Sequence, residues 1–360
     1  MSYVATEISS SKESAYDYTS KWNNVAIVCD GSRVLRLGNI GPEGAIPVME
    51  GKSVLFKMLG GINAFPLCIS TQDKEEIIKF VKIAEPIFGA VNIEDIESPK
   101  VLEIVERLQK ELPIPVFHDD QHGTAVIALA ALINSLKLVK KEIGNVFVVI
   151  AGAGSAGYGI FKILQEAGCK NIVVTDSQGA IYEGRDVVES YGSGNNYYKS
   201  EIAKKTNQRR LRGTLSETVR GTDVFIGVSG KAGILSKETV KSMNRDAIVL
   251  SLSNPEPEIY PSDALAAGAR IVATGRSDFP NQVNNALVFP SILRALLDLR
   301  VKTLSEDMLV AVAYAIASLI DDAHLNEGYI VPMVNDPRIL PVVNKTLKEK
   351  IQKHMAERNR

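Results

Sequence analysis

The chain has 360 residues, 45% of them hydrophobic, which is enough for two packed cores, so we expect two domains. Its 41 basic and 42 acidic residues nearly cancel. This balance excludes a bulk electrostatic attraction to nucleic acid or to an anionic membrane and favours a small-molecule partner. The cysteines, Cys29, Cys68 and Cys169, are widely spaced in or beside apolar runs, which indicates reduced thiols in the cytoplasm rather than a disulfide framework.

The N-terminal segment MSYVATEISSSKES has neither an apolar core nor an Arg-rich amphipathic pattern, so we expect neither a secretory signal nor a transit peptide. The longest apolar stretch, residues 125–139, is interrupted by Asn134, Ser135 and Lys137 and is shorter than a membrane span. We interpret this stretch as a buried helix.

Apolar runs of strand length alternate with segments of helical period along the chain, which is typical of an α/β fold with parallel sheets. In the first third, strands are predicted at residues 25–30, 65–70, 88–93 and 115–120, and helices at 74–85 and 99–111. A second series of strands is predicted at residues 146–151, 171–176, 223–228, 247–252 and 271–274. We place the domain boundary between Asp120 and Asn145, at the long apolar helix.

The remaining segments are predicted as connections and helices. Residues 190–200, rich in Gly, Ser, Asn and Tyr, are predicted to form a surface loop. Apolar helices are predicted at residues 286–298 and 305–320, and the polar tail at 345–360 is interpreted as a solvated helix face.

A glycine-rich turn opens the second series of strands. Gly152, Gly154 and Gly157 follow a β-branched run and precede an amphipathic helix, the context of a dinucleotide-binding motif. The glycines allow a tight turn, close approach of a pyrophosphate and close packing of the helix on the strand. Ser155 and Ala156 begin the predicted helix, and their amide groups are expected to face the phosphates. The alternative is a turn that only packs strand against helix.

Asp176 ends the next predicted strand, about twenty residues beyond the glycines, where a carboxylate can accept hydrogen bonds from the adenosine ribose. This position favours NAD over NADP. The alternative is that Asp176 only caps the following turn.

Two pairs of acidic residues follow predicted strands of the first series. Glu94 and Asp95 follow one strand, and Asp119 and Asp120 follow another, so both pairs are expected at the ligand-binding edge of the sheet. Carboxylate oxygens suit Mg²⁺ or Mn²⁺. A single pair of acidic residues would be interpreted as a helix cap or a solvated turn. Two such pairs after apolar strands are harder to explain in that way. His118 and His122 are expected to be structural, because an oxygen-rich site does not require them.

Several segments together resemble the malic enzyme family, specifically its short prokaryotic branch. The matching segments lie between Asp30 and Asn285: DGSRVLRLGNIGPEGAIPVMEGKSVLFK, NIEDIESP, FHDDQHGTA, GAGSAG, SLSNPEPEI and TGRSDFPNQVNN. The resemblance implies that Glu94, Asp95 and Asp120 hold the metal, that Lys52 is the general base, and that Asp119 supports Lys52.

The same resemblance implies that Arg33 binds a substrate carboxylate and that Asn254 and Asn285 contact the substrate, with Asn254 and Asn284 also near the cofactor. Each of these residues has an alternative interpretation when it is considered alone. Lys52 could be a solvated helix residue and Arg33 could form an ordinary surface ion pair. Asn254 and Asn285 could be turn residues. The implied organisation is a homodimer whose chain comprises a malate- and metal-binding domain (residues 1–122), a Rossmann-like NAD(P)-binding domain (123–285) and C-terminal helices (286–360) that fold back onto the first domain.

The implied activity is metal-dependent oxidative decarboxylation of (S)-malate to pyruvate and CO₂, with NAD, or alternatively NADP, as the hydride acceptor. The chemistry agrees, because a Lys whose pKa is lowered by desolvation or a neighbouring cation can accept the hydroxyl proton, and a metal can stabilise the enolate left by CO₂ loss. We expect the lysine and carboxylates of the N-terminal half to share one cleft with the nicotinamide.

The sequence departs from the family pattern near its start. A YTPGVA-like segment, whose tyrosine protonates the enolpyruvate, is not found, and Tyr3 is the remaining candidate acid. The alternatives are an incomplete N-terminus, or protonation by another group or by water, while Tyr16 and Tyr18 are expected to be structural. Arg36 and Ser291 replace small residues of the family pattern.

These departures leave other activities open. Malolactic conversion or oxaloacetate decarboxylation would use the same metal and base. The alternative that is not an enzyme is a sensor protein that binds NAD and whose catalytic activity is weakened.

Overall fold

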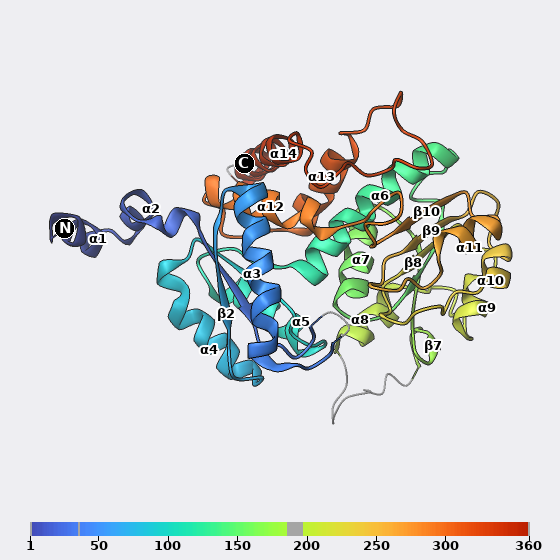
Figure 1. The fold of residues 1–360 in the computed structure, drawn as a ribbon, viewed down its shortest axis with the longest axis horizontal. Coiled ribbons are helices and arrows are strands. Elements are labelled where there is room, and N and C mark those ends of the chain that lie inside the picture. The colour runs from blue at the N-terminus through green and yellow to red at the C-terminus, as the bar shows by residue number, and fades with distance from the viewer. Residues whose placement is uncertain (1, 35–36, 186–196, 359–360) are drawn as a thin grey trace. The chain divides into compact units, whose positions relative to one another are not determined.

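The computed structural model describes residues 2–34, 37–185 and 197–358 and divides the chain into two compact units (Figure 1). The first unit comprises Met1–Asp119, Ala286–Ser305 and Pro337–Arg360, and the second comprises Asp120–Asn285 and Glu306–Asp336. We expected all of residues 286–360 to accompany the first domain, but the segment Glu306–Asp336 groups with the second unit.

The first unit contains a four-stranded parallel sheet. Its strands are β1 (Asn24–Cys29), β2 (Asn63–Cys68), β3 (Ala90–Ile93) and β4 (Val116–His118), in the order β2-β1-β3-β4. Helices α3 (Gly41–Gly60), α4 (Lys74–Ala84) and α5 (Lys100–Glu111) connect successive strands. Since all the strands are parallel, their carboxyl ends meet at one edge, where α/β proteins bind ligands.

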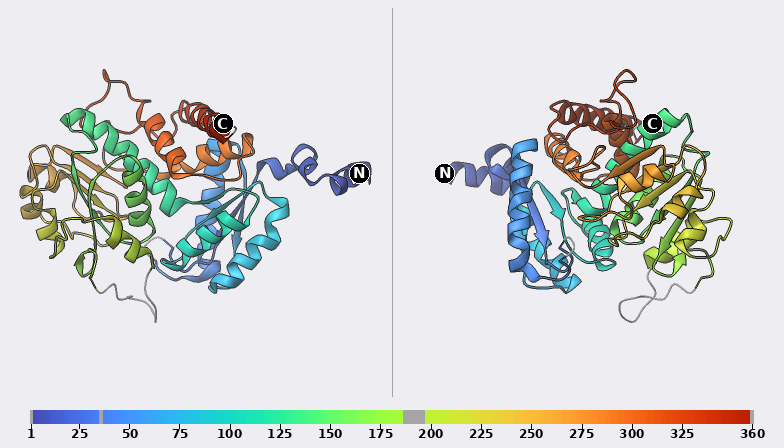
Figure 2. Two further views of the ribbon diagram at one scale, coloured as in Figure 1. Left: turned by 180° about the vertical axis from the view of Figure 1, so that it is seen from behind. Right: turned by 45° about the vertical axis from the view of Figure 1, so that its right-hand side comes forward.

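Further helices complete the first unit: α1 (Ser2–Ser10), η1 (Lys12–Ser14), α2 (Ala15–Tyr18), η2 (Ser20–Asn23), η3 (Glu85–Ile87), α12 (Phe289–Asp298) and α14 (Ile339–Arg358). Helix α12 is buried over almost its whole length and packs against α3 and α14. Helix α1 buries none of its residues, and α1 and α2 project away from the sheet of this unit in every view (Figures 1 and 2).

The second unit contains a six-stranded sheet in the order β10-β9-β8-β5-β6-β7. Its strands are β5 (Phe147–Ala151), β6 (Asn171–Asp176), β7 (Gly179–Ala180), β8 (Val224–Gly227), β9 (Ile248–Ser251) and β10 (Ile271–Thr274). All pairings are parallel except that of β6 with β7. This is the doubly wound strand order of dinucleotide-binding folds, so the predicted α/β class is confirmed.

The helices around this sheet are α6 (Thr124–Val139), α7 (Ser155–Glu166), α8 (Tyr197–Lys205), α9 (Leu215–Val219), α10 (Lys237–Lys241), α11 (Pro261–Ala266) and α13 (Glu306–Ala317), while η5 (Asn285–Leu287) marks the passage between the units. Helix α13 packs against α6 and α7. The amide of Asn134 in α6 donates to the carbonyls of Ala317 and Ile330, which secures the segment Glu306–Asp336 to this unit.

The predicted buried helix is confirmed in α6. By length and composition, Asp119–Val139 is the one helical stretch of the described residues that could cross a membrane, and 78% of its most apolar window is buried inside the structure. The polar residues that interrupt it are accommodated, since Asn134 makes the two contacts above and the Ser135 hydroxyl donates to the Ala131 carbonyl at 2.7 Å.

Two local differences from the sequence prediction have physical reasons. Helix α3 was not predicted, because its sequence carries Pro47 and several glycines, yet the proline lies within the helix and Gly61 ends it in a left-handed conformation. Residues 197–200, predicted as part of a loop, form the first turn of α8, so that part of the prediction is wrong. Residues 190–196 of the predicted loop lie outside the described residues.

Candidate active site

Lys52 lies among carboxylates in the first unit. Helix α3 directs its side chain to the carboxyl edge of the sheet, where Nζ lies 2.6 Å from Glu94 Oε1 and 2.6 Å from Asp119 Oδ2. The ammonium also lies 4.4 Å from the ring centroid of Phe289 in α12. The side chain is only 10% exposed, so these ion pairs are screened little by water.

The protonation of Lys52 differs from the expectation. Burial favours the neutral amine, but the charges of Asp119 and Glu94 and their hydrogen bonds outweigh this effect and raise the pKa of Lys52 above its usual value. The expected lowering of the Lys52 pKa is therefore wrong for this arrangement of two carboxylates around the ammonium. A cation held by Glu94 would neutralise one of the two carboxylates that keep the proton on Lys52.

The turn after β3 places Glu94 and Asp95. The amide of Asn92, two residues earlier on the strand, donates to Glu94 Oε2 at 2.8 Å. Asp95 adopts a positive φ of 49°, and its carbonyl accepts a hydrogen bond from the Arg33 amide at 3.0 Å. The backbone of Arg33 is thus fixed beside the turn that carries these two acids, while its side chain is exposed.

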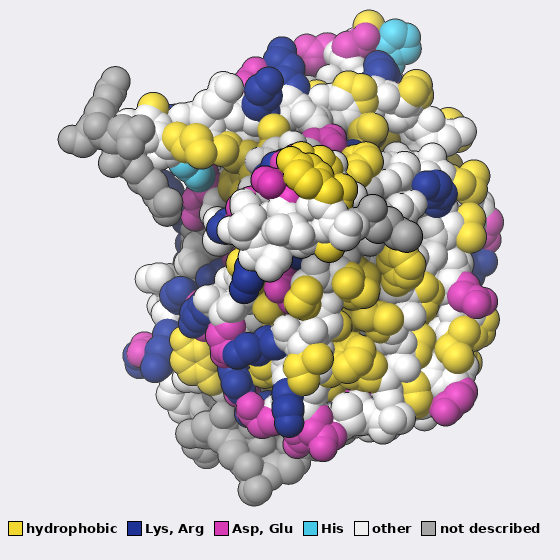
Figure 3. All heavy atoms as spheres, turned by 90° about the vertical axis from the view of Figure 1, so that its left-hand side faces the viewer, with side chains coloured by type: hydrophobic (Ala, Val, Ile, Leu, Met, Phe, Trp, Pro, Cys, Tyr) yellow, Lys and Arg dark blue, Asp and Glu magenta, His cyan; other side chains and the backbone are white. Residues whose placement is uncertain are grey.

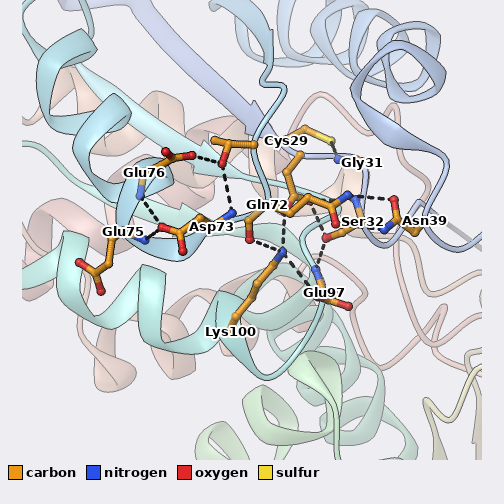
Figure 4. Close-up of polar contacts among 12 residues, drawn as sticks. Cys29, Gly31, Ser32, Asn39, Gln72, Asp73, Glu75, Glu76, Glu97 and Lys100 are labelled. Atoms are coloured by element: carbon orange, nitrogen blue, oxygen red, sulfur yellow. Dashed lines mark hydrogen bonds and ion pairs between the residues drawn. The ribbon is translucent and has the colours of Figure 1, made fainter. Parts of the chain in front are cut away.

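An ion pair and several hydrogen bonds brace the loop that carries Arg33, and Figure 4 shows Ser32, Glu97 and Lys100 of this network. Asp30, fully buried, accepts hydrogen bonds from the Ser32 amide and hydroxyl and lies 2.8 Å from Lys100 Nζ. The Ser32 hydroxyl in turn accepts a hydrogen bond from the Glu97 amide at 2.9 Å. Together with the backbone hydrogen bond from Arg33 to Asp95, these side-chain contacts hold the loops after β1 and β3 together.

Asp120 completes a group of three carboxylates. One oxygen each from Glu94, Asp95 and Asp120 lies within 4.8 Å of the others. Asp120 follows Asp119, the last residue of the first unit, by one peptide bond, within the π-helical turn Asp119–Gly123. Three carboxylates at this spacing fit a hard divalent cation, which takes oxygen ligands. His118 and His122 are buried beside them.

The glycine-rich turn of the second unit is shaped by close contacts. Gly152 has a φ of 120°, and a Cβ there would lie 2.6 Å from the Val228 carbonyl oxygen. A Cβ on Gly157 would collide with the Gly152 carbonyl, whereas one on Gly154 would meet open space. Gly154 directly precedes α7, whose first residues are Ser155 and Ala156. This geometry leaves room for a phosphate at the helix N-terminus.

Asp176 ends β6 beside this turn. Its carboxylate accepts hydrogen bonds from Arg185 at 2.7 Å, from the Gln178 amide at 2.9 Å and from Lys199 at 3.0 Å. Burial opposes ionisation of Asp176, yet these donors outweigh it and lower its pKa. Asp176 is therefore a carboxylate at neutral pH, and both of its oxygens already accept hydrogen bonds.

The other residues proposed from the sequence lie in varied surroundings. Asn254 is exposed in the loop after β9 and donates to the Gly275 carbonyl at 3.3 Å, and Asn285 pairs with Thr124. Asn284 is half-buried next to Asn285. Tyr3 is 78% exposed on α1, so within one chain the structure does not bring it to Lys52. Arg36 lies outside the described residues.

Three residues of these surroundings were not proposed from the sequence: Asn92, Phe289 and Glu258. Glu258 is fully buried and accepts hydrogen bonds from Ser229, Ser251 and Ser253, which follow or end β8 and β9. In the sequence PEPEIY, Glu258 resembles a turn residue. Its contacts with the three serines are therefore visible only in the three-dimensional structure.

One unit contains a doubly wound sheet with this glycine turn, and the other contains a parallel sheet with a lysine among carboxylates. These features together define the class of two-unit dinucleotide-binding enzymes. The chain belongs to the malic enzyme family. Residues 2–109 match the N-terminal domain of malic enzymes, and residues 121–347 match the malic enzyme NAD-binding domain.

Curated relatives and solved structures agree with this membership. The chain is 52% identical to the bifunctional malic/malolactic enzyme of Bacillus subtilis (92% of this chain, 79% of that protein). It is 50% identical to the NAD-dependent malic enzyme of Geobacillus stearothermophilus (96% and 70%). The crystal structure of an NAD-dependent malic enzyme from Thermotoga maritima superposes with a TM-score of 0.91 at 46% identity, covering 96% of this chain and 89% of that one.

Proposed function

We propose that this protein catalyses the divalent-metal-dependent oxidative decarboxylation of (S)-malate to pyruvate and CO₂, with reduction of NAD⁺ or NADP⁺. The observation that carries the proposal is the position of Lys52 between Glu94 and Asp119, next to the carboxylates of Asp95 and Asp120, in a chain of the malic enzyme family.

The chain's own residues have distinct roles in this proposal. Glu94, Asp95 and Asp120 would hold the cation, and Lys52, in its neutral amine form, would accept the proton of the malate hydroxyl, with Asp119 orienting the Nζ atom. Arg33 would bind a substrate carboxylate, and Asn254 and Asn285 would position malate against the dinucleotide. A bound divalent cation supplies polarisation of the ketone that forms, and a bound nicotinamide supplies the hydride acceptor.

In the proposed dinucleotide site, the turn of Gly152, Gly154 and Gly157 receives the pyrophosphate. The amides of Ser155 and Ala156 face it from the start of α7. Asp176 would bind the adenosine ribose and Asn284 would contact the cofactor, and the role of Tyr3 as the acid that protonates the enolpyruvate stays a prediction. Its test is Tyr3→Phe, since unchanged pyruvate formation would exclude Tyr3 as the acid.

The function is tested by a malate assay with NAD⁺ and NADP⁺ in parallel, each with and without Mg²⁺ or Mn²⁺. We expect pyruvate, CO₂ and reduced cofactor in equal amounts, and only when the cation is present. Cofactor reduction that is independent of malate or of the cation would contradict the proposal.

A malolactic activity is the second candidate. The specific observation is that the 52% identical relative is named a bifunctional malic/malolactic enzyme. In this outcome the hydride returns to pyruvate before release, so lactate accumulates without net reduced cofactor. Separation of lactate and pyruvate by chromatography, in the same assay, distinguishes the two activities.

We further propose a cytoplasmic homodimer. The described cysteines, Cys29, Cys68 and Cys169, are all free thiols, which suits a reducing compartment. Hydrophobic side chains gather over a broad area of the face in Figure 3. The exposed hydrophobic residues of α3 and of the edge strand β2, here called the α3 patch, are Ile46, Val54, Leu55, Met58 and Phe65. An exposed apolar area beside a sheet edge favours a second copy as its partner.

A further inference from the structure

Two cysteines lie opposite one another at the ends of neighbouring strands. In the parallel pairing of β1 with the edge strand β2, Cys29 and Cys68 are register partners, and each is the last residue of its strand. Register partners of parallel strands point to the same face of the sheet, and the strands lie about 4.8 Å apart. Disulfides join residues whose Cα atoms are about 4.4–6.8 Å apart. The two thiols are therefore within reach of one another, and a hydrogen bond joins them.

The two thiols differ in their access to solvent. Cys29 is fully buried, whereas Cys68 is partly exposed on the edge strand. Because side chains alternate along a strand, Cys68 points to the face of β2 opposite that of Phe65, the residue of this strand in the α3 patch. A partner copy bound over Phe65 thus leaves Cys68 accessible to a small oxidant. Burial raises the pKa of both thiols, so both are protonated at neutral pH and stay reduced until an oxidant is present.

Cys29 directly precedes the loop that carries Arg33. Its sulfur accepts a hydrogen bond from the Gly31 amide at 3.3 Å, as Figure 4 shows. A Cβ on Gly31 would lie 2.1 Å from the carbonyl oxygen of Gly41, the first residue of α3, so the turn at Gly31 packs directly against that helix. A bond from Cys29 to Cys68 would turn the sulfur away from the Gly31 amide. The start of the loop then has to move, and the tight packing at Gly41 directs this movement along the loop toward Arg33.

We propose that Cys29 and Cys68 form an oxidation site, where a hydroperoxide converts the two thiols to an intrachain disulfide that weakens malate binding by displacing the loop of Arg33. The accessible thiolate of Cys68 attacks hydrogen peroxide, the O–O bond breaks, and a sulfenic acid and one water form. The sulfur of Cys29 then attacks that of Cys68, so that the S–S bond forms, the S–O bond breaks and a second water leaves. The two thiols lose two electrons, which reduce the peroxide, and an excess of a small dithiol reverses the change.

The site is tested on the full-length protein with a small excess of hydrogen peroxide, followed by alkylation of the remaining thiols and mass spectrometry of the peptides. We expect a peptide pair joined through Cys29 and Cys68, while Cys169, which is buried in the second unit, is alkylated as a free thiol. Dithiothreitol should restore both thiols. Cys68→Ser should abolish the bond, and the matched control Cys169→Ser should retain it. Absence of the bond after peroxide treatment, or a disulfide that includes Cys169, would overturn the inference.

The effect on malate rests on the proposed function and is measured separately. We expect oxidation to raise the KM for malate by about tenfold, the loss of one charge-assisted contact, and to leave NADH binding to the second unit unchanged. Dithiothreitol should reverse the rise, and Cys68→Ser should not show it. A disulfide that leaves the KM unchanged would overturn the link to the loop of Arg33. Because the peptide map needs no turnover, failure of malate oxidation in the reduced protein contradicts the proposed function without affecting the oxidation site.

Discussion

Lys52 is a buried cation that forms ion pairs with two carboxylates. These contacts determine the expected effect of substituting Lys52 on malate oxidation. Lys52→Ala leaves Glu94 and Asp119 facing one another without their shared ammonium, and the reaction loses its proton acceptor. We expect malate oxidation to fall by about 10²–10⁴-fold, the usual contribution of a general base.

The measurement is kcat for malate, with NADH binding followed in parallel to show that the second unit is intact. Lys57→Ala on the exposed side of the same helix is the control and should retain activity. A Lys52→Ala protein with normal kcat would remove this residue from the mechanism.

Asp120 is predicted to act through the cation. Asp120→Ala removes one of three carboxylates whose oxygens lie within 4.8 Å of one another. We expect the Mn²⁺ concentration for half-maximal activity to rise by about tenfold or more, as when groups that support a metal site are removed. Asp322→Ala, at an exposed acid of the second unit, should leave the metal requirement unchanged. An unaltered Mn²⁺ dependence in Asp120→Ala would exclude Asp120 as a ligand.

At the scale of elements, Glu258 joins the ends of two strands. Its carboxylate accepts hydrogen bonds from the amides of Ser229 and Ser253 and from serine hydroxyls, so it ties the loop after β8 to the loop after β9. The latter loop contains Asn254, whose peptide bond to Pro255 is cis.

Glu258→Gln places an amide donor against groups that themselves donate. We expect the free energy of unfolding to fall by about 1–3 kcal/mol, the cost of an unsatisfied buried polar group. The KM for the dinucleotide should also rise, because both loops lie at the carboxyl edge of the sheet. Urea unfolding and cofactor titration measure these effects, with Glu256→Gln at an exposed neighbour as the control. Unchanged values in Glu258→Gln would show that the loops hold their positions without it.

Elements with a regular apolar pattern could be predicted, and others could not. The strands β1, β3, β5 and β6 are short apolar runs followed by polar residues, and the structure places strands at these positions. Helix α3 escaped prediction because its outer face carries exposed apolar residues such as Val54 and Met58, which blur the amphipathic period, in addition to Pro47.

For the site, spacing alone indicated the glycine turn and the acids after β3 and β4. The contacts between Lys52 and these acids join residues 42 and 67 positions apart, and no local pattern encodes such a pairing. The raised pKa of Lys52 depends on the same long-range contacts. Likewise, nothing in the sequence indicates that Lys199 meets Asp176.

At the scale of the whole molecule, the α3 patch bears on assembly. Met58 is 75% exposed, and Met58→Lys places a charge where the proposed partner copy would bury apolar surface. We expect this variant to sediment as a monomer in analytical ultracentrifugation at concentrations where the unaltered protein is a dimer. Leu265→Lys, at an exposed apolar residue of the second unit, should stay dimeric. A dimeric Met58→Lys protein would place the interface elsewhere.

The order of the chain through the two units was the least predictable feature. Residues after Ser305 join the second unit, because α13 packs on α6 and α7 and the amide of Asn281 donates to the Glu327 carbonyl at 2.7 Å. From Pro337 the chain belongs to the first unit again, where α14 packs on α12. An apolar helix is compatible with either core, so hydrophobic pattern alone does not assign it.

The proposed oxidation of malate requires one hydride transfer that depends both on Lys52 with its carboxylates and on the dinucleotide turn. This transfer is tested with (S)-malate labelled with deuterium at C2 and mass spectrometry of the products. With Mn²⁺ present, we expect the deuterium in the reduced nicotinamide, or in lactate if the hydride returns to pyruvate, and in neither with Lys52→Ala. Deuterium that stays in unreacted malate when the unaltered protein, cofactor and Mn²⁺ are all present would contradict the proposed hydride transfer.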